Sequence, residues 1–226
     1  MYTERAALGA RGAVWRNTVA GPYRVLPDGC LDLIWTGAEV TVAGPDTGPY
    51  LGSSSGEVFT GLRLASGVGP RVLGVPAREL TDRRIPLADL WGGAEARRLA
   101  ERLAESGAPG RILEEAAAAR LADAGPADPV VGEALAGLDA GDPVHVIAVR
   151  AGLSERQLHR RCLDAFGYGL KTLARIRRLG RAVSLTSAGV PLADVAFQAG
   201  YADQAHLSRE VKTLAGVPPS AFRPAG

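Results

Sequence analysis

The sequence has very little cysteine and lysine, and it has no long apolar run. Cys30 and Cys162 are the only cysteines among 226 residues, too few for a disulfide framework, so a reducing cytoplasm is the expected compartment. No run of 18 or more apolar residues occurs, which argues against a transmembrane helix. The first residues carry charges where a signal peptide needs an apolar core. Lys171 and Lys212 are the only lysines, so arginine carries nearly all of the positive charge.

Patterns typical of metal sites and hydrolases are also missing. His145, His159 and His206 do not have ligand spacing, and no Cys-x-x-Cys pair occurs. The serine run at 53–55 lacks the Gly-x-Ser-x-Gly pattern that places a nucleophilic serine on a sharp turn. We therefore expect no metal, no cofactor and no enzymatic activity.

The formal net charge of +2 hides a strong asymmetry along the chain. Residues 1–144 carry 14 Arg and 19 Asp or Glu, a net charge of −5. Residues 145–226 carry 12 Arg or Lys and 5 Asp or Glu, a net charge of +7. A basic module that follows an acidic one indicates that only the C-terminal part meets a polyanion.

The N-terminal third is typical of an antiparallel β-domain, either a barrel or a sandwich. Leu31, Leu33 and Trp35 alternate with Asp32 and Ile34, which predicts a strand with one strongly apolar face. A flexible loop is expected at 44–57 because this segment is rich in Gly, Ser and Pro. Short apolar segments separated by Gly and Pro predict strands at 13–19, 23–35 (interrupted by the turn Pro27-Asp28-Gly29), 39–44, 58–66 and 70–77.

From Pro86 onwards the pattern changes to helices. We expect three helices between residues 87 and 140, with Asp128 as an N-cap, and a boundary at Gly141, after which Asp142 caps the next helix. The resulting prediction is an α+β chain with three parts: a β-rich ligand-sensing domain at 1–86, a helical connector and dimerisation segment at 87–141, and an all-helical domain at 142–226. Helices are expected at 87–106, 111–124, 128–140, 143–152, 154–167, 170–187, 191–200 and 203–216.

The helical domain contains an internal repeat. Gly152 and Ser154 predict a tight turn followed by an N-capped helix. The pattern returns about 48 residues later, with Gly200 and Asp203 at the matching positions. Further matched pairs are Ala148 with Ala196, Leu158 with Leu207, Arg160 with Arg209, Cys162 with Val211, Gly167 with Gly216, and Leu173 with Phe222. A core does not need the paired arginines, whereas two helices that read DNA would.

The repeat resembles the DNA-binding domain of AraC/XylS-family transcription regulators, most closely in the tail GYADQAHLSREVKTLAGVPPSAFR at 200–223. The resemblance implies two helix-turn-helix units joined by a long helix and placed in successive major grooves. The stretches LPDGCLDLIW and GPRVLGVPA also resemble the β-rich, cupin-like sensor domain of such regulators. The base-reading residues implied are Arg156, His159 and Arg160 in the first unit, and Gln204, Ser208 and Arg209 in the second. On the connecting helix, Lys171, Arg175, Arg177, Arg178 and Arg181 either meet phosphate or form a solvated face.

The expected function is sequence-specific regulation of transcription, with double-stranded DNA as partner and a small-molecule effector at the β-domain. Trp15, Tyr23, Trp35, Arg63 and Arg71 are the candidate ligand-binding residues, although the aromatic ones are equally typical of a core. Two alternatives stay open. In the first, the helical module has lost DNA binding and the protein sequesters a small molecule. In the second, the β-domain is an enzyme or a methyl acceptor at Cys30.

Overall fold

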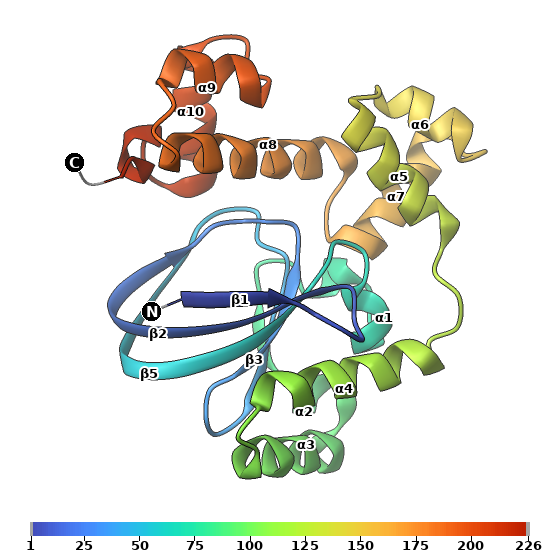
Figure 1. The fold of residues 1–226 in the computed structure, drawn as a ribbon. Coiled ribbons are helices and arrows are strands. Elements are labelled where there is room, and N and C mark those ends of the chain that lie inside the picture. Colours follow the sequence, from blue (N-terminus) through green and yellow to red (C-terminus); the bar gives the residue numbers. More distant parts are fainter. Residues whose placement is uncertain (1, 225–226) are drawn as a thin grey trace.

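The computed structural model describes residues 2–224, which form a curved antiparallel sheet followed by helices (Figure 1). The strand order is β1-β2-β5-β3-β4-β6, and every neighbouring pair is antiparallel. The strands are β1 (Tyr2–Ala6), β2 (Gly12–Val25), β3 (Leu31–Trp35), β4 (Val40–Ala43), β5 (Tyr50–Leu64) and β6 (Arg84–Pro86).

The sheet is dominated by the long ribbon of β2 and β5. Its register runs from Gly12 opposite Leu64 to Val25 opposite Tyr50. The prediction of a loop at 44–57 is therefore wrong for residues 50–57, which form the first part of β5. Pro22 does not interrupt β2, because β1 pairs with β2 only as far as Asn17 and leaves the outer edge of β2 open at Pro22.

Strand β3 confirms the predicted alternation of faces. Leu31, Leu33 and Trp35 are buried in the core, while Asp32 and Ile34 are half-buried on the opposite face. The expected strand at 70–77 is wrong, since this segment forms α1 (Gly69–Leu73) and the 3-10 turn η1 (Ala77–Glu79). A short apolar run does not distinguish a strand from a buried helix, and Pro70 suits the first turn of a helix.

The next helices divide between two hydrophobic cores. The helix expected at 87–106 is two helices, because Gly92, with φ +84°, separates α2 (Ala88–Trp91) from α3 (Gly93–Glu105). Leu99 and Leu103 of α3 and Leu113 of α4 (Pro109–Asp123) share the core of the sheet. Ala134 of α5 (Pro129–Ala140) instead lies in a second core with the helices that follow, and Asp128 caps α5 as expected.

The C-terminal helices confirm the predicted internal repeat. Ser154 and Asp203 both cap the following helix with their side chains, and Gly152 and Gly200 have φ angles of +66° and +83°. The expected capping by Asp142 is wrong: Pro143 is the N-cap residue, and Asp142 accepts a hydrogen bond from Arg150 at 2.6 Å. The elements are α6 (Val144–Arg150), α7 (Glu155–Phe166), α8 (Leu170–Ser187), α9 (Leu192–Ala199), α10 (Gln204–Ala215) and the 3-10 turn η2 (Pro219–Phe222).

The helical module packs directly against the β-domain, with α8 lying above the curved sheet (Figure 1). At the end of α7, the Gly167 carbonyl accepts a hydrogen bond from the Thr81 hydroxyl at 3.1 Å, and Asp164 forms an ion pair with Arg78. Leu26, which follows β2, packs against the core of the second helix-turn-helix unit. Both units therefore contact the β-domain.

Gly67 lies where the β-domain meets α5 and α7, and a substitution there tests this contact. A Cβ at Gly67 would lie 2.5 Å from Val131 Cγ1 and 3.2 Å from Phe166 Cε1, and the φ angle is +82°. We expect Gly67→Ala to displace α5 and α7, with faster hydrogen exchange in both helices. The matched control is Gly74→Ala, which has a φ of +79° but no atom within 4 Å. Overpacking should make Gly67→Ala about 1–3 kcal/mol more destabilising than this control; equal losses in thermal or urea unfolding would contradict the contact.

Candidate DNA interface and ligand cavity

Helix α7 presents its expected reading residues to solvent. Ser154 and Gln157 form a capping box, which fixes the start of the helix behind the turn at Gly152. Leu158 is fully buried and anchors the helix. Arg156, His159 and Arg160, which stood out in the sequence, are exposed on the other faces of the helix.

Helix α10 repeats this arrangement. The Asp203 carboxylate accepts a hydrogen bond from the His206 backbone N–H at 2.6 Å and so caps the helix. Leu207 is fully buried, at the position that matches Leu158 of α7. Gln204 and Arg209 are exposed and Ser208 is half-buried, so all six residues implied by the resemblance lie on faces that a partner can reach.

Part of the positive charge of α8 is used inside the module. The buried carboxylate of Glu210 contacts the Arg175 and Arg178 guanidinium groups at 3.2 and 3.0 Å and the His206 ring at 3.0 Å. Burial opposes ionisation of Glu210, but Arg178 and Arg175 outweigh it and lower the pKa of this carboxyl. This network fixes α10 against α8.

The remaining cations of α8 have different roles. Arg177 forms an ion pair with Asp139 of α5. Lys171 and Arg181 are exposed, and no ion pair with them is present among the described residues 2–224. The two are therefore free to meet phosphate, whereas Arg175, Arg177 and Arg178 already have acidic partners.

The concave face of the sheet encloses a cavity of about 470 Å³. Alternate residues of β2, β3 and β5 point into it, because side chains two apart along a strand share a face. The segment that follows β2 supplies Leu26, Asp28 and Cys30 to the wall. The rest of the lining comes from Tyr2, Trp15, Asn17, Val19, Tyr23, Arg24, Val25, Asp32, Ile34, Thr36, Thr41, Ala43, Gly44, Asp46, Tyr50, Phe59, Arg63 and Arg84.

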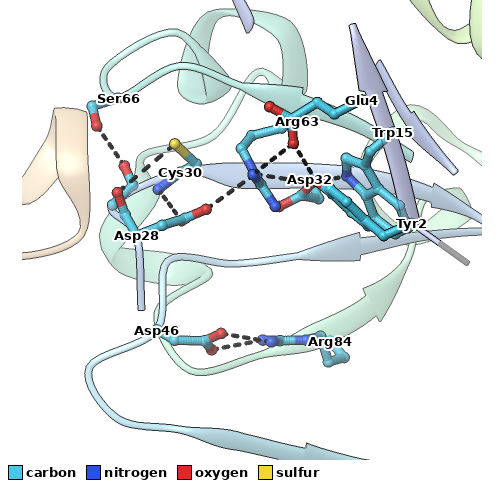
Figure 2. Close-up of polar contacts among 11 residues, drawn as sticks. Tyr2, Glu4, Trp15, Asp28, Cys30, Asp32, Asp46, Arg63, Ser66 and Arg84 are labelled. Carbon is cyan, nitrogen blue, oxygen red and sulfur yellow. Dashed lines mark hydrogen bonds and ion pairs between the residues drawn. The ribbon is translucent and has the colours of Figure 1, made fainter. Parts of the chain in front are cut away.

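A single guanidinium group lies among several carboxylates on the cavity wall (Figure 2). Arg63 Nε is 3.0 Å from Asp28 Oδ2 and 3.7 Å from Asp32 Oδ1, and Arg63 Nη1 is 3.4 Å from Glu4 Oε2. The Trp15 indole N–H donates to Asp32 at 2.6 Å. In a separate pair, Arg84 donates two hydrogen bonds to Asp46, at 2.8 and 2.6 Å.

Three of the five residues expected to bind a ligand line the cavity, and two do not. Trp15, Tyr23 and Arg63 lie in its wall. Trp35 is buried on the core side of β3, because it shares the face of Leu31 and Leu33 rather than that of Asp32. Arg71 lies on helix α1, not on a strand, and its guanidinium donates to the carbonyl of Gly125.

Sequence reasoning missed the carboxylates of the cavity. The sequence pattern places Asp28 in a turn, Asp32 on a strand face and Asp46 in a loop. For Asp32 a signal was present, because it alternates with the apolar residues of β3 and must lie on the face opposite to them. The position of Asp46 depends on its pairing with Arg84, 38 residues away, which no local pattern indicates.

Cys30 has the environment of an inert thiol. Its burial, and secondarily the nearby carboxylates Asp28 and Asp32, raise the pKa of the thiol well above its usual range. A methyl-accepting cysteine needs the opposite, since the thiolate is the nucleophile. The structure therefore argues against a methyl acceptor at Cys30.

Asp32 provides a test of the cavity electrostatics. Burial raises the pKa of Asp32 from 3.8 to about 6, and repulsion from Asp28 adds to this effect. The attraction of Arg63 and the hydrogen bond from Trp15 act in the opposite direction but are weaker. Between pH 4 and 6 the folded state binds more protons at this group than the unfolded state, so its contribution to stability falls as pH rises. The difference in unfolding free energy between Asp32→Asn and wild type should therefore shift in favour of the variant by on the order of 1–3 kcal/mol as pH rises from 4 to 7. Urea unfolding of both proteins across this range measures the difference; a pH-independent offset would contradict the raised pKa.

Residues 2–224 contain neither a membrane-spanning helix nor a metal-binding cluster. In this part of the chain no helix is both long and apolar enough to cross a membrane. Within the same residues no group of three or more His, Cys, Asp or Glu side chains has an arrangement that could hold a metal ion.

Comparisons with known proteins separate the same two parts of the chain. A helix-turn-helix domain family matches residues 147–225, and a domain of unknown function (DUF6597) matches residues 13–86. No curated protein matches the chain. Among solved structures, ToxT from Vibrio cholerae O395 is similar with a TM-score of 0.50 and 12% identity over 98% of this chain and 96% of that chain. Unsaturated fatty acid bound wild-type ToxT from Vibrio cholerae strain SCE256 is similar with a TM-score of 0.49 and 13% identity over 92% of each chain.

These findings agree with the geometry of the helical module. The similarity to ToxT from Vibrio cholerae O395 shows that a β-rich domain followed by a helical domain is an arrangement already present in a solved structure. The matched helix-turn-helix family covers α7 and α10, the two capped helices with exposed arginines at equivalent positions. The chain therefore carries an AraC-type helix-turn-helix domain behind a β-rich N-terminal domain, which is the organisation of a DNA-binding transcription regulator.

Proposed function

We propose that α7 and α10 read two successive major grooves of one operator, and that a small molecule in the β-domain cavity controls this binding. The observation that carries the proposal is the equivalence of the two helices: each is capped, each is anchored by a buried leucine, and each exposes an arginine at the matched position. Arginine forms two hydrogen bonds to a guanine edge, which makes Arg160 and Arg209 the strongest candidates for base recognition.

The other reading residues have supporting roles in this proposal. Arg156 and His159 flank Arg160 on α7, and Gln204 and Ser208 precede Arg209 on α10. Glutamine pairs with adenine in the major groove. Lys171 and Arg181, the free cations of α8, contact phosphate and set the position of the domain on the duplex.

The cavity in this proposal binds its ligand and does not transform it, and the regulator acts in the cytoplasm. The segment between β2 and β3 lies between the cavity and the helical module. Leu26 lines the cavity and also packs against the second unit, while a Cβ at Gly29 would lie 2.9 Å from Leu173 of α8. A ligand that shifts this segment therefore changes how the two units are held.

The salt dependence of DNA binding tests the proposed function. A duplex selected from random sequence should bind the full chain, and log K should fall linearly with log salt concentration, by about 0.9 per phosphate contacted. Fluorescence anisotropy with labelled duplex measures this slope. A flat response, or no duplex recovered in the selection, would favour the alternative of a sequestering protein.

Dimerisation through residues 87–141 remains a prediction. In the structure α3 and α4 pack on the sheet with their apolar faces, and their outer faces carry ion pairs such as Arg111 with Glu115. Sedimentation of the full chain with and without operator DNA measures the oligomeric state.

A further inference from the structure

We propose that the ligand of the cavity is an organic cation with an aromatic or apolar body. This inference rests on the proposed function, in which the cavity is the effector site, and it names the chemical class of the effector.

The immediate surroundings of Arg63 have more negative than positive charge, from Asp28 and Asp32 of the wall and from the adjacent Glu4 (Figure 2). The Arg63 guanidinium is the shared ion-pair partner of three carboxylates. Its nitrogen atoms lie 3.4, 3.0 and 3.7 Å from carboxylate oxygens of Glu4, Asp28 and Asp32. The Asp28 side chain is 42% exposed, so one of these carboxylates is open to a further partner. A cation placed here would complete the pairing of three carboxylates that now share one positive group.

The aromatic rings of the cavity favour the same charge. Tyr2 and Trp15 stack with ring centroids 6.5 Å apart, and the Tyr23 and Tyr50 centroids are 6.4 Å apart. The faces of such rings attract cations. The Arg84 guanidinium already lies over the Tyr50 ring, 4.2 Å from its centroid, which shows that a ring of this wall accepts a positive group.

Two of the three arginines in the wall already have acidic partners. Arg84 is held by Asp46 through two hydrogen bonds, and Arg63 is surrounded by carboxylates. The third, Arg24, is exposed, and its Nε lies about 4.0 Å from a Cβ built at Gly216, next to the second helix-turn-helix unit. A carboxylate placed beside Asp28 and Asp32 would therefore share Arg63 with both of them and have no counter-ion of its own there, which is costly.

The size of the cavity suits a ligand with a substantial body. Its volume of about 470 Å³ falls within the usual range of small-molecule pockets, roughly 300–1,000 Å³. Val19, Ile34 and Phe59 add apolar surface to the wall. The cavity thus offers carboxylates for a cationic end and aromatic and aliphatic side chains for the rest of the molecule.

Three probes that share an indole body and differ in charge test the proposal on the full chain. Tryptamine is a cation at pH 7.5, tryptophol is neutral, and indole-3-propionate is an anion. Calorimetric titration should show tryptamine binding at least 10-fold more tightly than the other two. Asp28→Asn should weaken tryptamine binding at least 10-fold, because the amide carries no charge. The amide oxygen can still accept the hydrogen bond from the Cys30 backbone N–H, so the local fold is kept. The matched control, Asp89→Asn on the exposed surface of α2, should leave all three affinities unchanged.

Asp32→Asn, which also removes a charge from the cavity wall, is the second variant if Asp28→Asn does not fold, and it should weaken tryptamine binding without affecting tryptophol binding. Equal affinity of the three probes, tighter binding of indole-3-propionate, or no binding of any probe would overturn the proposal. The titration contains no DNA. A failure of this inference is therefore distinguishable from a failure of the proposed function, which the salt dependence of operator binding measures.

Discussion

Replacing Arg160 or Arg209 by alanine is expected to weaken binding to the selected operator by about 1–3 kcal/mol each, or roughly 5- to 150-fold. The reason is that each arginine is exposed on a capped, well-anchored helix and can form two hydrogen bonds to one guanine. Because the two residues lie on different units, their effects should add in the double variant. Anisotropy titrations against the operator and against a scrambled duplex measure the loss.

The pattern across sequences separates base recognition from general electrostatics. Arg160→Ala should relax the preference at one position of the first half-site only, and Arg209→Ala at one position of the second. Lys171→Ala should weaken binding to the operator and to the scrambled duplex by the same factor. It should also reduce the slope of log K against log salt concentration by about the value of one phosphate contact. The control is Arg111→Ala on α4, where the ion pair with Glu115 is exposed and no effect on DNA is expected. If Arg160→Ala and Arg209→Ala behaved like this control, the assignment of the reading helices would be wrong.

Leu207→Ala should destabilise the second helix-turn-helix unit by about 2–5 kcal/mol, and Leu158→Ala should do the same to the first. Both leucines are fully buried, yet they belong to different cores, so each substitution leaves a cavity in one unit only. Hydrogen exchange should rise in α9 and α10 for Leu207→Ala and in α6 and α7 for Leu158→Ala. The strands of the β-domain should be unaffected in both.

Ala205→Ser is the matched control for Leu207→Ala, since Ala205 is exposed on the same helix. It should change unfolding free energy by less than about 0.5 kcal/mol. Uniform loss of protection across the whole chain in Leu207→Ala would show that the three cores unfold as one unit and would contradict this prediction.

The helical half was predictable because its signals are local and occur twice. Ser154 and Asp203 mark helix starts, Gly152 and Gly200 mark turns, and the repeat confirms each assignment independently. The exposed position of Arg160 follows from its helical phase relative to Leu158. The acidic partner of Arg178 was not predictable, because Glu210 lies 32 residues further along the chain.

The cavity was predictable only in part, because it depends on how distant strands pair. Trp15 and Arg63 were found as isolated aromatic and charged residues on strands, but their meeting with Asp32 requires β2, β5 and β3 to be neighbours in that order. The glycine and serine residues of 52–56 favoured a loop over the strand that is observed, since the long pairing with β2 overrides local preference. The helix at Gly69–Leu73 was missed for a similar reason: a five-residue apolar segment has no clear period.

The length of α8 has a consequence for operators. Its 18 residues span about 27 Å, close to one turn of duplex DNA at roughly 34 Å, which in the proposed binding mode suits half-sites one turn apart. One residue inserted into α8 would turn the second unit by about 100° around the helix axis and point Arg209 away from the groove. An insertion of seven residues, about two full turns, would restore the direction but add about 10 Å to the separation. Half-site spacing and helix length are therefore expected to change together or not at all among related regulators.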